Sequence, residues 1–245
     1  RSGGEVGGSR AAHWMLLETA FASLVSKQST GLWSSHNDHA LLNQTGKAAL
    51  RGISQEGLFI FHANRASDIN QVLQFSARHQ LSSVISGGQE AWIVRDALAE
   101  AGVPVVLNAL DNLPGSFDGL GARLDNAALL HEAGVTVLFT SGETHNARKL
   151  RQVVGNAVAN GFPYQAAISA ITSVPAAVFG GAPRLLAPGL DADLVIWSGD
   201  PLEVDSAADQ VIIDGKLDPM TSRQTELLKR YLPTEVGLGR AYVRP

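Results

Sequence analysis

Residues 58–69 read LFIFHANRASDI and place a histidine, His62, directly after an apolar run. Ser67 and Asp68 follow and open a helical pattern. A buried strand that delivers an imidazole to its C-terminal end is how a parallel α/β barrel presents a metal ligand or a catalytic base. The alternative interpretation is a hydrogen-bonded histidine in a strand-to-helix loop, with no chemical role.

Polar side chains also follow two later apolar segments, residues 104–108 and 135–140. They are Asn108 and Asp111 after the first, and Ser141, Glu143, His145 and Arg148 after the second. Asn108 and Asp111 are candidates for a substrate pocket, or for a simple turn over residues 111–114. Arg148 can bind a substrate carboxylate with two parallel hydrogen bonds, or form an ion pair on a helix surface.

Two catalytic arrangements and one structural role are open for the second group. Ser141, His145 and Asp111 contain the groups of a serine hydrolase, but no G-x-S-x-G nucleophile elbow surrounds the serine. Glu143 and His145 can instead bring a carboxylate and an imidazole toward His62 if their loop folds inward. The simpler alternative is that residues 142–146 cap the next helix, with Thr144 or Asn146 as the N-cap.

Composition excludes several classes of protein. The 245 residues suffice for one large domain or two small ones. A net charge of −4 and a pI near 6.0, without a basic run, argue against nucleic-acid binding. The absence of cysteine excludes disulfides, thiolate-bound zinc and thiol catalysis, and leaves both a cytoplasmic and an exported (periplasmic) location open. No apolar run approaches the roughly 20 residues of a membrane span.

The elements that must position these residues alternate regularly. Apolar segments of strand character lie at residues 58–62, 82–86, 104–108 and 135–140, and helical patterns at 68–79, 90–101, 120–133 and 146–160. Gly102 and Gly134 each end a helical pattern just before a strand. Repeated strand–helix units predict a parallel sheet covered by helices. A doubly wound open sheet fits less well, because no glycine-rich phosphate loop follows any strand.

The flanking regions have a different character. Residues 1–57 predict a helical and loop segment, with Trp14, Leu17, Phe21 and Leu24 on one helix face that suits core packing. Residues 163–179 predict a helix interrupted by Pro175. Residues 183–216 contain two short β segments with glycine turns, and residues 217–245 a helix and tail. His36, Asp38 and His39 lie in a polar stretch that predicts a solvated loop.

The C-terminal third resembles a known family. APGLDADLVIWSGDPLE followed by VIIDGK is similar to the C-terminal cassette of the amidohydrolase superfamily, in its imidazolonepropionase-like branch. AISAITSVPAAVFG resembles the helix before that cassette, HANRASDI the fifth-strand motif, and SRQTELLKRY a tail of some members. The resemblance covers about residues 58–231. It implies the C-terminal half of a (β/α)8 TIM-like barrel, followed by part of a small accessory β-sandwich.

The resemblance also implies a site and exposes departures from it. Members of the family bind one or two divalent metals. His62 matches the metal ligand of the fifth-strand motif, and zinc is the expected ion. At the end of the sixth strand the family has a histidine where this chain has Gly87, and at the end of the eighth an aspartate where it has Ser141. Glycine has no ligand atom and a neutral hydroxyl is a poor one. We therefore do not expect this chain to assemble a dinuclear site.

Strands one to four of the barrel have no counterpart in the sequence. Four parallel strands cannot close a barrel of eight and leave two unpaired edges. We therefore expect this chain to combine with a complementary half-barrel chain, to form a homo-oligomer, or to be part of a longer polypeptide that begins before Arg1.

Three functions follow as hypotheses. The first is a metal-dependent amidohydrolase that acts on a small molecule with an amide, cyclic amide or dipeptide-like C–N bond and needs the missing half. The second is a degraded barrel that serves as a structural or binding subunit. The third is a metal-independent hydrolase that uses Ser141. The first hypothesis is preferred, because His62 is present and a mononuclear site needs only about three protein ligands.

Overall fold

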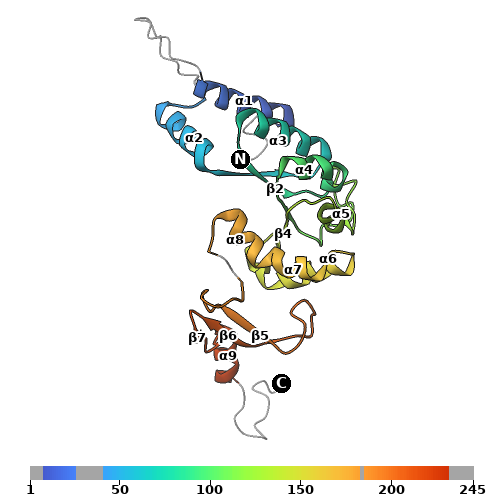
Figure 1. Ribbon diagram of the computed structural model, residues 1–245, viewed down its shortest axis with the longest axis vertical. Helices are drawn as coiled ribbons and strands as arrows, with labels where there is room; N and C mark the ends of the chain where they lie inside the picture. The colour runs from blue at the N-terminus through green and yellow to red at the C-terminus, as the bar shows by residue number, and fades with distance from the viewer. Residues whose placement is uncertain (1–7, 26–40, 183–184, 232–245) are drawn as a thin grey trace, which may run out of the picture. The chain divides into compact units, whose positions relative to one another are not determined.

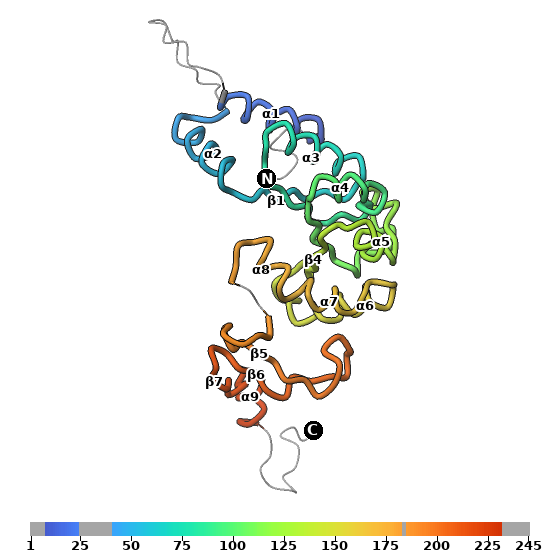
Figure 2. The backbone as a smooth tube through the Cα atoms, in the orientation of Figure 1, coloured from blue at the N-terminus to red at the C-terminus, as the bar shows by residue number. Residues whose placement is uncertain are grey.

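The chain forms two compact units, residues 1–182 and residues 183–245. The structure is a computed structural model that describes residues 8–25, 41–182 and 185–231. The stretch that contains His36, Asp38 and His39 lies outside the described residues. Figure 2 traces the larger unit through its repeated strand–helix connections.

A parallel sheet forms the centre of the larger unit. Its strands are β1 (Leu58–Ala63), β2 (Ser82–Gly87), β3 (Val105–Leu107) and β4 (Val137–Phe139), hydrogen-bonded in the order β1-β2-β3-β4. Because crossovers between parallel strands are right-handed and this order never reverses, the connecting helices follow one another along one face (Figure 1). A doubly wound sheet would reverse its order. The predicted α/β half-barrel is confirmed.

Three of the α-helices that follow the strands begin later than predicted. The helical elements after the strands are α3 (Ala66–His79), the 3-10 turn η2 (Ala91–Val94) with α4 (Arg95–Ala101), α5 (Asn126–Glu132), and the 3-10 turn η3 (Thr144–Lys149) with α6 (Leu150–Ala159). The helix predicted over residues 120–133 starts only at Asn126. Gly121 instead bonds outside its own segment, accepting from Trp92 Nε1 at 2.7 Å and donating to Glu90 Oε1 at 2.9 Å.

An aromatic cluster joins the N-terminal helices to the sheet. Helix α1 (Arg10–Val25) precedes α2 (Gln44–Glu56), and Trp14 and Phe21 of α1 pack on Phe75 of α3, with ring centroids 5.6 and 5.1 Å apart. Phe61 of β1 meets the same ring at 6.2 Å. Phe75 is only 2% exposed. The predicted apolar face of α1 is thus confirmed as core packing.

The predicted helix over residues 163–179 is divided into α7 (Tyr164–Ile171) and α8 (Ser173–Phe179). The break falls at Thr172, whose φ of −123° and ψ of −83° are not helical. Pro175 has no N–H to donate to the carbonyl four residues earlier, so the helix cannot continue unbroken through this point.

The smaller unit contains an antiparallel sheet and a helix. Its strands are β5 (Leu194–Trp197), β6 (Ala208–Ile213) and β7 (Lys216–Leu217), followed by α9 (Arg223–Tyr231). Asp214 and Gly215, with φ of 51° and 73°, form the two-residue turn between β6 and β7. The neighbours Val195 and Ile196 point to opposite faces of β5 and are 44% and 48% exposed, so both faces of this sheet leave apolar surface uncovered.

None of the helices in the described parts of the chain is long and apolar enough to cross a membrane.

Candidate functional site

The carboxyl ends of the parallel strands bring the predicted residues to one edge of the sheet. A Cβ atom placed on Gly87, at the end of β2, would lie 3.2 Å from His62 Cε1, at the end of β1. A Cβ atom on Gly142, beyond β4, would lie 3.7 Å from Asn108 Nδ2, beyond β3. This edge is where active sites of parallel barrels form.

His62 stands at a pocket of about 440 Å³. Its lining combines apolar and polar residues. The apolar ones are Trp14, Leu17, Phe61, Ala63 and Val72, and the polar ones are Arg10, His13, His62 and Asp68. Across the part of the chain that the structure describes, the imidazole of His62 makes no hydrogen bond, so the alternative of a hydrogen-bonded structural histidine has no support. Sequence reasoning missed Arg10 and His13, because only the packing of α1 brings residues so far upstream to this edge.

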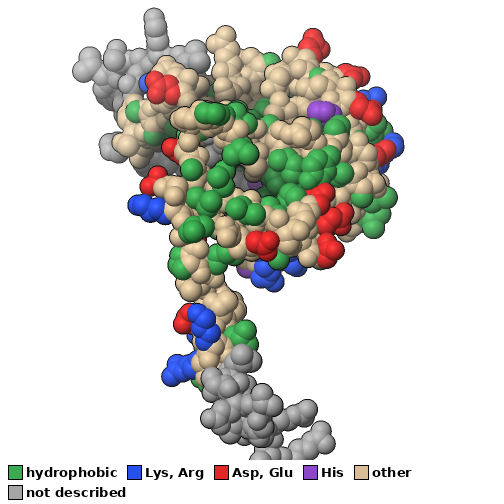
Figure 3. Space-filling model, turned by 60° about the horizontal axis from the view of Figure 1, so that its bottom comes forward, with side chains coloured by type: hydrophobic (Ala, Val, Ile, Leu, Met, Phe, Trp, Pro, Cys, Tyr) green, Lys and Arg blue, Asp and Glu red, His purple; other side chains and the backbone are tan. Residues whose placement is uncertain are grey.

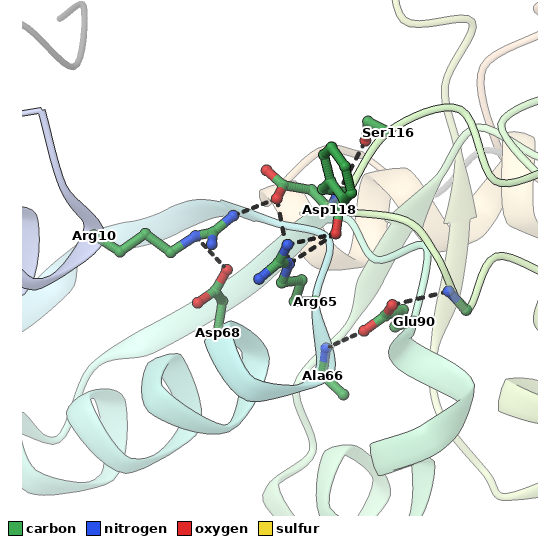
Figure 4. Close-up of polar contacts among 9 residues, drawn as sticks. Arg10, Arg65, Ala66, Asp68, Glu90, Ser116 and Asp118 are labelled. Atoms are coloured by element: carbon green, nitrogen blue, oxygen red, sulfur yellow. Dashed lines mark hydrogen bonds and ion pairs between the residues drawn. The ribbon is translucent and has the colours of Figure 1, made fainter.

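Charged residues join α1 to the first turn of α3 and to the loop over residues 108–125 (Figure 4). Arg10 Nε lies 2.9 Å from Asp68 Oδ2, and Arg10 Nη2 donates to Asp118 Oδ1 at 2.5 Å. Arg65 binds the same carboxylate at 3.2 Å and donates to the carbonyl of Phe117. The hydrogen bond from Arg10 lowers the pKa of Asp118, and the same bond raises the pKa of Arg10. The loop over residues 108–125 is therefore held to the start of α1.

Glu90 also holds the loop over residues 108–125 in place. Its carboxylate accepts from the backbone N–H of Ala66, the first residue of α3, at 3.1 Å and from that of Gly121 at 2.9 Å (Figure 4). The residue before α3, Arg65, offers no side-chain cap. A carboxylate at a helix N-terminus also interacts favourably with the helix dipole. Glu90 therefore holds two loops at the carboxyl edge of the sheet in fixed positions.

We expect Glu90→Ala to lower the free energy of unfolding by about 1–3 kcal/mol, because two backbone N–H groups lose their acceptor. Glu90→Gln keeps one acceptor oxygen and should lose less. Urea denaturation of the three proteins measures both effects. An alanine variant as stable as the parent would contradict this role.

Asn108 and Asp111 bond to each other. Asn108 Nδ2 donates to Asp111 Oδ2 at 3.1 Å, and the backbone N–H of Asp111 donates to the carbonyl of Asn108 at 2.9 Å. The two residues also line a small pocket with Gly87 and Gln89. The turn therefore spans residues 108–111 and not the predicted residues 111–114. Both residues lie at the carboxyl edge of the sheet, and their role in substrate binding stays a prediction.

The residues after β4 are not brought together as a catalytic group. Ser141 Oγ donates to the carbonyl of Glu143 at 3.2 Å, while the side chains of Glu143, His145 and Arg148 are exposed. No hydrogen bond between described residues links Ser141 with His145, or His145 with Asp111. The three groups of a serine hydrolase are therefore not assembled.

The predicted N-cap at Thr144 or Asn146 is wrong. These residues lie inside the 3-10 turn η3, whose N-cap is Glu143 without a side-chain hydrogen bond. The backbone N–H of Asn146 donates to the carbonyl of Glu143 at 2.9 Å, which closes a tight turn before α6 begins.

The described residues do not fit a complete metal site. Among them, no group of three or more His, Cys, Asp or Glu side chains is close enough to hold an ion. Beside His62, the position of Gly87 has a φ of 102°, and a Cβ atom there would lie 2.4 Å from Asn64 Oδ1. A side chain at this position is therefore strained and obstructed. Any metal bound at His62 needs ligands from outside these residues.

Comparison with known proteins gives partial matches. No family model matches the chain. It is 37% identical over 90 residues to the amidohydrolase tasK of Hapsidospora irregularis, a match that covers 36% of this chain and 9% of that protein. Its fold is similar to the crystal structure of an amidohydrolase from Thermotoga maritima MSB8, with a TM-score of 0.71, 21% identity, and coverage of 85% of this chain and 56% of the other.

A second amidohydrolase crystal structure has a TM-score of 0.51 and 20% identity, covering 70% of this chain and 46% of the other. The chain thus spans little more than half of the Thermotoga protein and a small part of tasK. At these identities the structural likenesses establish the fold.

Proposed function

We propose, from the resemblance to the amidohydrolase superfamily and with the support of the comparisons, that this chain forms the C-terminal half of a barrel that hydrolyses amide or cyclic amide C–N bonds, including dipeptide-like ones. The observation that carries the proposal is an exposed imidazole, His62, at a pocket on the carboxyl edge of a parallel sheet in barrel order. The imidazolonepropionase-like branch stays a prediction.

The sheet supports the proposal that other strands complete the site. Among the described residues, β1 pairs only with β2, and β4 only with β3. Ile60, in the middle of β1, is 60% exposed, and Figure 3 shows further apolar side chains on the surface among charged ones. The edges of β1 and β4 that have no strand partner among the described residues can each pair with a further strand. We propose a complementary half-barrel as the partner, with a second copy of this chain as the alternative.

The proposed roles follow from the positions of the side chains. His62 would contribute one ligand to a divalent metal, with zinc as the expected ion, and the complementary half would contribute the others. Asn108 and Asp111, already at the edge, would contact the substrate. Ser141, Glu143, His145 and Arg148 follow the outermost strand, and the exposure of the last three leaves them free to meet a substrate from that side.

The test compares this chain with the longer polypeptide that includes the sequence encoded before Arg1. We expect light scattering to find the 245-residue chain associated or poorly folded, and the longer protein to hydrolyse dipeptides or cyclic amides. A stable, cooperatively folding monomer of this chain, together with a longer protein that hydrolyses none of these substrates, would contradict the proposal.

A second function is favoured by the position at Gly87. Because Asn64 and a positive φ close that position to a side chain, the barrel would lack one ligand even when complete. A catalytically degraded barrel that acts as a structural or binding subunit accounts for this. It predicts a stable complex without hydrolysis.

A further inference from the structure

We propose that Asn64 is a positioning residue for His62: its carboxamide oxygen accepts one imidazole N–H and so fixes which ring nitrogen is free for chemistry. The inference rests on the proposed function only in taking His62 as the functional imidazole. The approach of both side chains to the position of Gly87 is a property of this chain.

The two side chains converge on one point at the end of β2. A Cβ atom on Gly87 would lie 2.4 Å from Asn64 Oδ1 and 3.2 Å from His62 Cε1. Cε1 is bonded to both ring nitrogens, so a modest rotation of the imidazole turns an N–H toward the Asn64 oxygen. His62 is near the end of β1 and Asn64 directly follows that strand, and both side chains approach the same neighbour.

The oxygen of Asn64 has no other partner. It is buried, and it accepts no hydrogen bond from any described residue. Buried polar atoms are nearly always paired, so an unpaired one beside an imidazole points to a donor that another state of the site supplies. An imidazole N–H is that donor, and an acceptor on one ring nitrogen commonly fixes the tautomer of a functional histidine.

The other polar groups around His62 are less suited to this role. Arg10 and Asp68, which line the same pocket, are paired with each other at 2.9 Å. His13, from α1, is exposed. The adjacent strand β2 ends in Ser86 and Gly87 and contributes no charge. Among these neighbours, Asn64 offers a buried acceptor without a partner among the described residues.

Gly87 keeps the space in which this contact forms. With a φ of 102° and no side chain, it leaves room for the carboxamide beside the ring. Any larger residue at this position would displace Asn64 first, because the Asn64 oxygen is the nearest atom. The position of the Asn64 carboxamide therefore depends on a glycine at residue 87.

The test is the tautomer of His62 in this chain, read from long-range proton–nitrogen NMR spectra at about pH 8.5, where an ordinary histidine is neutral. The His62 signals are assigned by their loss in His62→Gln. We expect a tautomer ratio at least about fivefold away from that of free histidine in the parent, as one hydrogen bond allows. Asn64→Leu should return it to the free value, and Asn64→Asp, which keeps the oxygen, should preserve it.

A parent ratio equal to that of free histidine, or a parent ratio retained in Asn64→Leu, would overturn the proposal. Backbone amide spectra verify that each variant is folded, and Asn64→Ala replaces the leucine variant if that one unfolds. Because the measurement needs neither substrate nor partner, its outcome is independent of whether the complete protein hydrolyses amides.

Discussion

Replacing His62 by alanine is expected to lower kcat/KM of the complete protein at least about 100-fold, the lower end of what a positioned acid, base or ligand contributes. His62 is exposed and forms no hydrogen bond with the described residues, so the stability of the protein should change by no more than about 0.5 kcal/mol. Steady-state hydrolysis of a dipeptide or cyclic amide, measured beside urea denaturation, separates the two effects.

The contrast between activity and stability is the control in this experiment. A variant that loses hydrolysis and keeps its denaturation midpoint supports a chemical role for the imidazole. A His62→Ala protein that hydrolyses the same substrate at the parent rate would exclude His62 from the site and, with it, the proposed location of catalysis.

Replacing Phe75 by alanine is expected to lower the free energy of unfolding by about 3–5 kcal/mol, the usual loss for a buried aromatic ring. Its ring is 2% exposed and meets Trp14, Phe21 and Phe61, which come from α1 and β1. One truncation therefore loosens the contact between the N-terminal helix and the sheet. Urea denaturation of the longest stably folded form measures the loss.

Met15→Ala is the matched control. Met15 lies on the same helix, α1, but is 70% exposed, so its truncation should change stability by no more than about 0.5 kcal/mol. If Phe75→Ala cost as little as Met15→Ala, the aromatic cluster would not be what joins α1 to the sheet.

The sequence alone predicted the order of elements that places His62. Apolar segments that alternate with helical patterns, two of which end at Gly102 and Gly134, predicted a parallel sheet, and the sheet has that form. These signals are local, because strand and helix periodicity and a left-handed C-terminal residue depend on neighbours in the chain. Because parallel strands have their carboxyl ends at the same edge of a sheet, the sequence also predicted that the residues after the strands lie at one edge.

The contacts around the site were not predictable in the same way. The late start of α5 depends on bonds from Gly121 to Trp92 and Glu90, some thirty residues away in the sequence. The pocket depends on α1, which brings Arg10 and His13 to the end of β1. No periodicity encodes such pairings, because they form only when separate elements pack.

The relation between Asn64 and Gly87 was likewise not predictable from the sequence. The sequence alone shows only that Gly87 replaces the histidine ligand of the family. In the structure it is also the space that the Asn64 carboxamide needs beside His62. The change at one position is therefore tied to the residue at another, across neighbouring strand ends.

The metal content of the complete protein, measured for the parent and for His62→Ala, tests the central claim most directly. The account predicts close to one zinc ion per chain in the parent and loss of that zinc in the variant, because His62 is the ligand that this half contributes. Zinc bound equally in both proteins, or absent from both, would contradict it.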